Sequence, residues 1–482
     1  MSNIEKFEMK LSIEKSKDGR RGFRFKRETL SPDIEDKYLR KEEPKLPQMS
    51  EIDVVRHFTR LSKLNFSIDT HFYPLGSCTM KYNPKVNEDT ANLEGFASLH
   101  PESLEECAQG ILEIIYDAKN RFCEICAMDD ATLWPAAGAQ SELCGILIAR
   151  KYFEAKNDCR SEIIVPDSAH GTNPATATMA GFKTINMKSN NEGEIDIDTL
   201  KKTLSPKTAV LMLTIPNTLG VFESRIEEIV KHCHNNGTLV YMDGANMNAL
   251  IGLVKPGDFG VDLMHLNLHK TFSTPHGGGG PGSGAILVKK HLSDFLPIPI
   301  VEKNEDRYIL NENKPKTIGR IKSNFTNTGV LLKAYTYLLM HGAKELREVS
   351  QNAIINANYV KSKLEKIYPA YAKRYCMHEC VLTPPKEMMD KGIKTLDIAK
   401  RLLDYGFHAP TVYFPLVVHE AIMIEPTETE NKETLDEFIE TMIKIYNEAK
   451  ENPQFIKDAP CDMPVKRIDE VKAAREPNLR WL

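Results

Sequence analysis

The chain has 482 residues, of which 41% are hydrophobic and 27% charged, and its formal net charge is −4. This composition is typical of a soluble globular protein of two or three domains, and the interspersed charges exclude the basic footprint of a nucleic-acid-binding protein. No apolar run approaches the roughly 18 residues of a membrane span, and the charged N-terminal segment lacks the apolar stretch of a secretory signal. We therefore expect a cytoplasmic protein whose ten cysteines are reduced.

Residues 1–50 are highly charged and contain several prolines, so we expect an N-terminal arm without a packed core. From residue 51 to about 335 the pattern becomes globular, with helical periodicity at 102–128 and then short apolar segments between amphipathic ones. The apolar segments predict strands at residues 161–167, 183–187, 208–216, 237–245, 262–270 and 284–290. Strands that are apolar throughout and separated by helices predict a large α/β domain with a mostly parallel sheet covered on both faces.

The C-terminal third reads differently. Residues 328–367 are a long helical segment, and residues 336–455 hold mixed elements that end in a second long helical stretch. We expect a smaller α+β domain over 336–455. Residues 456–482 are predicted to be a polar tail on the surface.

The cysteines offer one metal-like pattern. Cys123 and Cys126 form a CxxC pair, and the run His232, Cys233, His234 could complete a zinc site. No second pair follows at similar spacing, so buried small hydrophobic side chains are the better interpretation, and we expect no metal.

The strongest chemical motif surrounds Lys270. A strand-like segment ends at this lysine, and a glycine-rich loop follows, with glycines at positions 277–280, 282 and 284. A lysine beside a backbone free to adopt positive φ suits an amine that forms a Schiff base with the aldehyde of pyridoxal phosphate (PLP). The alternative is an ordinary surface lysine before a flexible loop. A P-loop does not fit, because its lysine follows the glycines and this one precedes them.

Two further polar residues follow predicted strands. Asp243 ends an apolar segment, where a carboxylate could keep the pyridine nitrogen of PLP protonated or could simply cap a turn. His170 follows the segment 161–167 and could stack on a cofactor ring, although a histidine bonded within a turn is the commoner case.

Gly138 and Ala139 precede a helical segment, and Gln140 follows them. Small residues let a helix N-terminus approach a phosphate, whose charge the backbone N–H groups stabilise, while a tight turn into a helix is the simpler alternative. The order of phosphate loop, histidine, aspartate and lysine, each at the end of a predicted parallel strand, is typical of fold-type-I PLP enzymes. We therefore expect these residues to converge on one cleft.

Long motifs carry a resemblance to a known family. They are FYPLGSCTMKYNP (72–84), PAAGAQSEL (135–143), SAHGTNPATATMAG (168–181), PNTLGVFE (216–223), MDGANMNAL (242–250), NLHKTFSTPHGGGGPGSG (267–284), CMHE (376–379), GFHAPTVYFP (406–415), MIEPTETE (423–430) and VKAAREPNLRW (471–481). In these segments, which span nearly the whole chain, the sequence resembles the glycine dehydrogenase (decarboxylating) family. This family is the P-protein of the glycine cleavage system, and the match is to subunit 2 of its split, two-chain form.

The resemblance implies a role for each matching residue. Lys270 would be the Schiff-base lysine, Asp243 the partner of the pyridine nitrogen, and His170 the residue over the ring. The cofactor would also contact Gly138, Ala139, Gln140, Asn217, Ala245, His269 and Thr271, and the substrate or its channel would involve Cys78, Lys81, Asn83 and His378.

The resemblance also implies PLP-dependent decarboxylation of glycine with transfer of the aminomethyl group to the lipoyl arm of H-protein and release of CO2. The implied partner is subunit 1, in an α2β2 heterotetramer. Lys81 could belong to the surface that receives the carrier or form a structural ion pair. Rival functions are another PLP-dependent decarboxylase or lyase of this fold, and a scaffold subunit without activity, against which the presence of both Lys270 and Asp243 argues.

Overall fold

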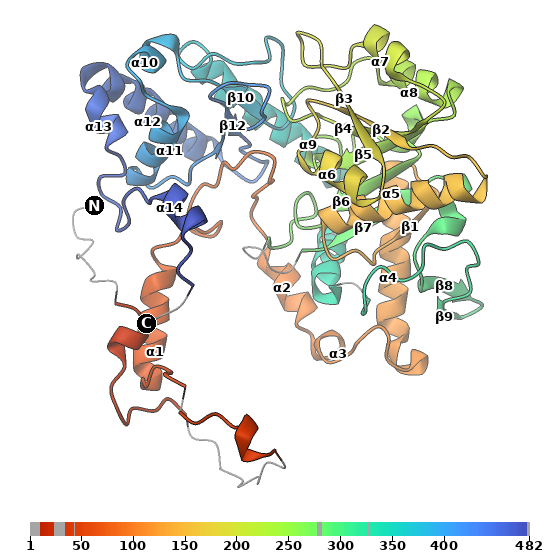
Figure 1. The fold of residues 1–482 in the computed structure, drawn as a ribbon, viewed down its shortest axis with the longest axis horizontal. Coiled ribbons are helices and arrows are strands. Elements are labelled where there is room, and N and C mark those ends of the chain that lie inside the picture. The colour runs from red at the N-terminus through yellow and green to blue at the C-terminus, as the bar shows by residue number, and fades with distance from the viewer. Residues whose placement is uncertain (1–9, 24–33, 43, 277–281, 326, 480–482) are drawn as a thin grey trace. The chain divides into compact units, whose positions relative to one another are not determined.

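The computed structural model describes residues 10–23, 34–42, 44–276, 282–325 and 327–479. It divides into two compact units, one of Met1–Thr70 with Asp462–Leu482 and the other of His71–Cys461, shown in Figure 1. The glycine run at positions 277–280, which the sequence places after Lys270, lies outside the described residues.

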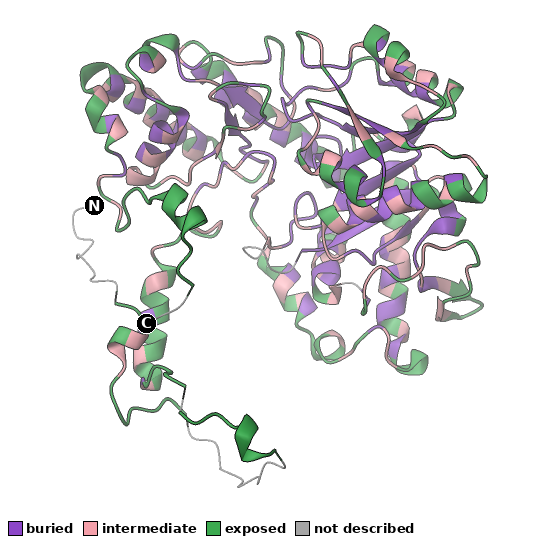
Figure 2. Cartoon of the chain, in the orientation of Figure 1, coloured by how far each residue is buried: buried purple, intermediate pink, exposed green. Residues whose placement is uncertain are grey.

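The first unit contains η1 (Ile13–Lys15), η2 (Asp36–Tyr38), α1 (Glu51–Ser62) and α14 (Glu470–Arg475). The helix α1 begins at Ser50, whose hydroxyl oxygen accepts the backbone N–H of Asp53. Most described side chains of this unit are exposed, as Figure 2 shows. Its described part therefore has little core of its own.

The second unit is built on a seven-stranded sheet of order β1-β7-β6-β5-β4-β2-β3. Its strands are β1 (Asp130–Thr132), β2 (Glu162–Pro166), β3 (Lys183–Met187), β4 (Thr208–Thr214), β5 (Leu239–Gly244), β6 (Leu263–Asn267) and β7 (Gly284–Val288). The strand β7 is antiparallel to both β1 and β6, while the pairs from β6 to β3 are parallel. All six predicted strands are confirmed, and β1 is an addition.

Both faces of the inner strands are buried, which explains why β2 and β4 to β7 are apolar without alternation, whereas the edge strand β3 is partly exposed. Along β4, Leu211 and Leu213 pack into one core cluster, and Val210 and Met212 pack into the other. The first cluster draws on α4 (Glu105–Cys126), α8 (Ile226–Asn235) and the N-terminal part of α9 (Thr328–Leu364), and the second on α5 (Gly138–Ala155) and α6 (Thr172–Met179). Helices thus cover both faces, as predicted (Figure 1).

The C-terminal part contains a three-stranded antiparallel sheet, β10-β12-β11, with β10 (Cys380–Leu382), β11 (Thr411–Val412) and β12 (Ile422–Ile424). Helices α10 (Lys386–Asp390), α11 (Thr395–Asp404), α12 (Lys432–Glu451) and α13 (Pro453–Lys457) accompany it. The helix α9 leads into this part and is interrupted at Gly342, whose φ of 57° is not helical. The predicted fold class, a large α/β part with a smaller α+β part, is confirmed.

The remaining elements are α2 (Lys85–Ala91), α3 (Glu94–Ala97), α7 (Ile197–Thr203), η3 (Met247–Ala249), η4 (Pro256–Phe259), η5 (Lys290–Phe295), β8 (Ile300–Asn304) and β9 (Arg307–Asn311). Within the described ranges, no helix is both long enough and apolar enough to cross a membrane.

Candidate active site

The strands from β6 to β3 run in the same direction. Strand β1 also runs in this direction, because β7 lies between β1 and β6 and is antiparallel to both. The carboxyl ends of β1, β2, β5 and β6 therefore share one edge of the large sheet. Gly138 follows β1, His170 follows β2, Asp243 lies at the end of β5, and Lys270 follows β6. Asp243 is close enough to His170 and Lys270 to interact with both electrostatically. The structure therefore brings the four predicted positions to a common edge, where open α/β sheets bind ligands.

The Asp243 carboxylate is buried and has several polar neighbours. Its Oδ1 accepts the backbone N–H of Ala245 (2.9 Å), and its Oδ2 accepts the side-chain amide of Asn173 (3.2 Å). Burial alone would raise the pKa of Asp243, but His265, then His170, then the Ala245 N–H outweigh it and hold the pKa below its ordinary value. A carboxylate that stays ionised suits a partner for a protonated pyridine nitrogen.

Sequence reasoning missed His265, which supports this carboxylate. Its Nε2 lies 3.3 Å from Asp243 Oδ1, and its Nδ1 lies 2.6 Å from the hydroxyl of Tyr241. All three side chains are at most 2% exposed. The available signal was a single histidine inside the apolar strand segment that ends before Lys270.

Lys270 is buried, and its Nζ donates a hydrogen bond to the backbone oxygen of Ser77 (2.8 Å). Ser77 and Thr79 both have positive φ, 62° and 49°, which is uncommon and costly for residues with a Cβ atom. The turn that carries Cys78 is therefore held in place by its surroundings. Burial raises the pKa of the Cys78 thiol, and the charge of Lys270 opposes this only in part.

Two buried glutamates hold this turn, and neither was a predicted site residue. Glu379 Oε2 accepts the N–H of Ser77 (2.8 Å), while Glu425 accepts the N–H of Thr79 (2.9 Å) and its hydroxyl (2.6 Å). Both carboxyls are fully buried. In the sequence, Glu379 directly precedes the apolar strand β10, and Glu425 directly follows the apolar strand β12.

His378 joins these glutamates. It is completely buried, and neither ring nitrogen has a hydrogen-bond partner among the described residues. Polar atoms of His378, Glu379 and Glu425 lie within 4.8 Å of one another. Burial, and then the charge of Lys270, lower the pKa of His378 to about 3, so the imidazole is neutral at physiological pH.

The N-terminus of α5 fits a phosphate group. The helix begins at Gly138, and no side chain caps it. A Cβ atom at Gly138 would lie only 2.3 Å from Asn267 Oδ1, so any other residue here would displace the Asn267 side chain. Thr271 and Thr274 have buried hydroxyls without partners in the described structure. Free helix N–H groups, these unbonded hydroxyls, Lys270 and the ionised Asp243 together suit the phosphate, aldehyde and pyridine nitrogen of PLP.

Three predicted cofactor residues use their polar groups within the protein. Gln140 accepts the N–H of Ala136 (2.7 Å) and donates to the carbonyl of Ile321 (3.2 Å). Asn217 accepts the N–H groups of residues 219 and 221 and donates to residue 193. Ala245 donates its N–H to Asp243, as described above. The side chains of Gln140 and Asn217 and the backbone of Ala245 thus shape the loops at this edge.

Two histidines near Lys270, His170 and His269, have lowered pKa values. His170 is bonded through Nδ1 to the Thr172 hydroxyl (2.9 Å), and burial lowers its pKa despite the opposing effect of Asp243. His269 lies 3.2 Å from the carbonyl oxygen of Ser283, and burial, followed by the charge of Lys270, lowers its pKa to about 4. Flat neutral rings of this kind can lie against a cofactor without adding positive charge.

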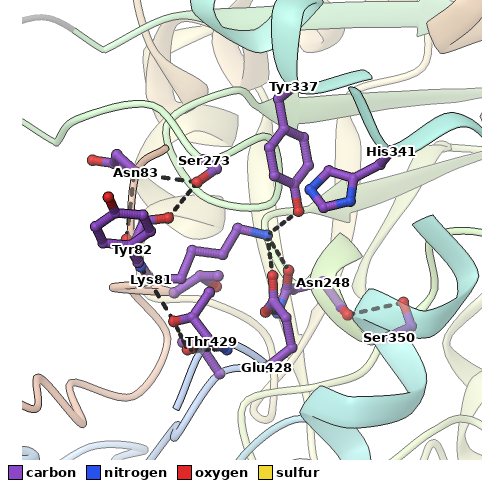
Figure 3. Close-up of polar contacts among 12 residues, drawn as sticks. Lys81, Tyr82, Asn83, Asn248, Ser273, Tyr337, His341, Ser350, Glu428 and Thr429 are labelled. Atoms are coloured by element: carbon purple, nitrogen blue, oxygen red, sulfur yellow. Dashed lines mark hydrogen bonds and ion pairs between the residues drawn. The ribbon is translucent and has the colours of Figure 1, made fainter. Parts of the chain in front are cut away.

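Lys81 is the centre of the polar network in Figure 3. Its Nζ contacts Glu428 Oε1 (2.7 Å), Asn248 Oδ1 (3.0 Å) and the Tyr337 hydroxyl (3.1 Å). The Lys81 side chain is 1% exposed, so it does not belong to an exposed carrier-binding surface. Its geometry fits the alternative interpretation, a structural ion pair, which it forms with Glu428.

Asn83 connects the same loop to the lysine turn. Its side-chain amide donates to the Ser273 hydroxyl (3.4 Å), which in turn donates to the backbone oxygen of Tyr82 (2.6 Å), as Figure 3 shows. Ser273 follows Lys270 by three positions and has a positive φ of 56°. Asn83 therefore supports the turn that carries Lys270.

The alternative zinc site is not assembled. Cys123, Cys126 and Cys233 are part of the buried core of the sheet, and burial raises the pKa of Cys123 to about 12. Among the described residues, the possible metal-binding groups that lie together are His378, Glu379 and Glu425, and they include none of these cysteines. Each of these cysteines is a buried small side chain, as expected.

Comparisons with known proteins show the family of this chain. Residues 349–462 match the family model "Glycine dehydrogenase, C-terminal domain", and residues 93–321 match "Aminotransferase class-V". Proteins named probable glycine dehydrogenase (decarboxylating) subunit 2 from Caldanaerobacter subterraneus and Kosmotoga olearia are each 54% identical. The first alignment covers 98% of both chains, and the second covers 98% of this chain and 99% of the relative.

Solved structures support the fold. A glycine decarboxylase (P-protein) of the glycine cleavage system in inhibitor-bound form aligns with a TM-score of 0.70 at 20% identity, over 86% of this chain and 92% of that one. A cysteine desulfurase from Thermococcus onnurineus aligns with a TM-score of 0.61 at 15% identity, over 79% and 95%. The chain therefore belongs to the glycine dehydrogenase (decarboxylating) subunit 2 family, whose members are PLP-dependent enzymes of fold type I.

Proposed function

We propose that this chain decarboxylates glycine with PLP and transfers the remaining aminomethyl group to the lipoyl arm of an H-protein, with release of CO2. It would act with the companion subunit 1 in an α2β2 heterotetramer. Its ten cysteines are free thiols, which fits a reducing, cytoplasmic location. The observation that carries the proposal is the convergence of Lys270, the ionised Asp243 and the uncapped N-terminus of α5.

Each of these groups has a defined task. When bound, PLP supplies the electron sink that accepts the electron pair released with CO2. Asp243, whose pKa is held low by its polar neighbours, His265 foremost, would hold the proton on the pyridine nitrogen. The N–H groups of Gly138 and Ala139 at the start of α5 would bind the phosphate.

The loop contacts orient the lysine. The backbone oxygen of Ser77 accepts from Lys270 Nζ and so fixes the direction of the amine within the site. His170, neutral and mostly buried, offers a flat face beside Asp243 without competing for its charge. The Asn83–Ser273 contact keeps the segment after Lys270 in its unusual conformation.

Exchange of labelled bicarbonate into glycine tests the proposal. The purified chain is assayed with and without its companion subunit and lipoylated H-protein, and we expect exchange only when all three are present. Lys270→Ala should abolish both the exchange and the visible absorbance of the cofactor–lysine linkage. Exchange that is independent of lipoylation would instead identify an ordinary amino-acid decarboxylase. No exchange with intact absorbance would assign another amino acid as substrate.

A further inference from the structure

The glutamate pair beside Lys270 has a chemical asymmetry that its structural role does not explain. Glu425 accepts two hydrogen bonds from Thr79, which stabilise a carboxylate. Glu379 accepts only the Ser77 N–H through Oε2, and its Oε1 has no partner in the described structure. A fully buried, unbonded carboxylate oxygen is costly, whereas a protonated Oε1 is a donor that awaits an acceptor.

The carboxyl groups of Glu379 and Glu425 lie within 4.8 Å of each other, so ionising both would cost free energy through charge repulsion. Burial, and then the neighbouring Glu425, raise the pKa of Glu379 well above its ordinary value. Burial raises the pKa of Glu425 to about 7, with the Thr79 hydrogen bonds acting in the opposite direction. The pair therefore retains a proton at neutral pH, and the hydrogen bonds place it on Glu379.

The proposed reaction consumes one proton. The bond between the glycine α-carbon and its carboxyl carbon breaks, and the electron pair remains with the α-carbon. That carbon then bonds to one lipoyl sulfur, the S–S bond breaks, and its electron pair leaves on the second sulfur. Zwitterionic glycine and a disulfide thus give CO2, an aminomethyl thioether and a thiolate, which becomes a thiol only by taking up a proton.

We propose that Glu379 is the acid that protonates the departing lipoyl sulfur, with Glu425 as the anion that keeps the proton on its neighbour. Oε1 of Glu379 gives up the proton, the sulfur becomes a thiol, and Glu379 regains a proton from solvent before the next turnover. In the reverse direction the thiol returns its proton to the same oxygen. This inference rests on the proposed transfer to a lipoyl arm.

The other titratable groups that face the pair fit this role less well. His378 is neutral, so it has no cationic proton to give. Cys78 has a pKa raised by burial and is a weak acid. Glu428, which also acts on Glu425, is ion-paired with Lys81. The positive charge of Lys270 acts on His378, Glu379 and Glu425 and opposes a metal cation among them.

Glu379→Gln separates acid function from loop support. The glutamine can still accept the Ser77 N–H but has no acidic proton. In the complex of both subunits with PLP, single-turnover formation of aminomethylated H-protein is followed by intact mass from pH 6 to pH 9. We expect a fall of about 100-fold at neutral pH. The wild-type rate should decline as the pH rises through the pKa of the pair, and the residual rate of Glu379→Gln should lack this decline.

Glu379→Asp and Glu223→Gln complete the series. Glu379→Asp keeps an acid and should regain part of the rate. Glu223 is a matched control: it is 2% exposed, accepts the N–H of Ile195, and has a pKa raised to about 7 by burial. Glu223→Gln should leave the rate and its pH dependence unchanged. A rate for Glu379→Gln within about threefold of wild type, or an unchanged pH profile, would overturn the assignment.

An infrared measurement tests the proton without turnover. At neutral pH the wild-type protein should show the C=O stretch of a protonated carboxylic acid that Glu379→Gln lacks. Absence of this band would overturn the inference. If the wild-type complex forms no aminomethylated H-protein although the band is present, the proposed function fails, while the protonation of Glu379 stands as a separate result.

Discussion

Asp243 and His265 are register partners on the neighbouring strands β5 and β6, with His265 Nε2 3.3 Å from Asp243 Oδ1. The other ring nitrogen of His265, Nδ1, forms a hydrogen bond of 2.6 Å with the hydroxyl of Tyr241. A side chain of the neighbouring strand β6 therefore helps to hold the Asp243 carboxylate in place. Because this contact lowers the pKa of Asp243, His265 helps to set the charge on which the cofactor would depend.

Asp243→Asn should retain the fold and the absorbance of the cofactor–lysine linkage but lose activity. A neutral amide cannot keep the pyridine nitrogen protonated, so we expect glycine-dependent CO2 release to fall by about 100-fold or more. The measurement is labelled CO2 release at saturating PLP. Asp262→Asn is the matched control, since Asp262 is also a buried carboxylate bonded to a histidine, His234 at 2.9 Å. Equal losses in both variants would contradict a specific role for Asp243.

Gly138→Ala should weaken PLP binding. The added Cβ atom would lie 2.3 Å from Asn267 Oδ1, so either the Asn267 side chain or the start of α5 must move. We expect a loss of about 1–3 kcal/mol in the free energy of unfolding and a lower PLP affinity by fluorescence titration. Gly110→Ala, in α4 with nothing within 4 Å, should instead stabilise the protein by about 0.5–1 kcal/mol without changing PLP affinity. Unchanged PLP affinity in Gly138→Ala would show that the cofactor does not approach this turn.

Lys81→Met should be strongly destabilising, because it leaves Glu428 buried without its ion-pair partner. Breaking such a pair costs about 3–5 kcal/mol. Replacing both partners, as in Lys81→Met with Glu428→Leu, should recover much of this loss, since no charge then remains buried. Urea unfolding of the four proteins in a double-mutant cycle measures the coupling. Additive effects would mean that the two side chains do not interact as Figure 3 shows.

His234 and Asp262 predict a pH-dependent contribution to stability. The hydrogen bond to Asp262 raises the pKa of His234 above 6.5. Burial would raise the pKa of Asp262, but His234 and His291 hold it below 3.8. The histidine contribution is full below pH 6.5 and is lost as the pH rises through the raised pKa. The aspartate contribution is full above pH 3.8 and is lost as the pH falls through the lowered pKa.

His234→Gln should therefore destabilise the protein most between pH 3.8 and pH 6.5. Because His234 is 42% exposed, solvent screening limits the expected loss to about 0.5–1 kcal/mol. Thermal unfolding at pH 5.5 and pH 8.5 measures it. A loss that is equal at both values, or larger at pH 8.5, would contradict the ion pair.

Local patterns predicted the strands of the large sheet because both of its faces are buried. Strands β2 and β4 to β7 are apolar along most of their length, and this pattern is visible without any partner. The edge strand β3 is apolar only at Ile185 and Met187. The edge strand β1, Asp130–Thr132, has no such run. It exists through backbone pairing with β7, and local sequence does not encode a contact across so many residues.

The sequence by itself determined the sheet and the candidate cofactor residues, because strand ends in a parallel sheet must share one edge. Only the tertiary structure decided which polar groups remain free there. The amides of Gln140 and Asn217 bond to nearby backbone, and Lys81 is committed to Glu428. The contacts of Ser77 with Glu379 and of Thr79 with Glu425 join residues 302 and 346 positions apart. The sequence does not show which residue such a glutamate will contact. Its hydrogen-bond partner, and therefore its charge, is set only when folding brings the distant residues together.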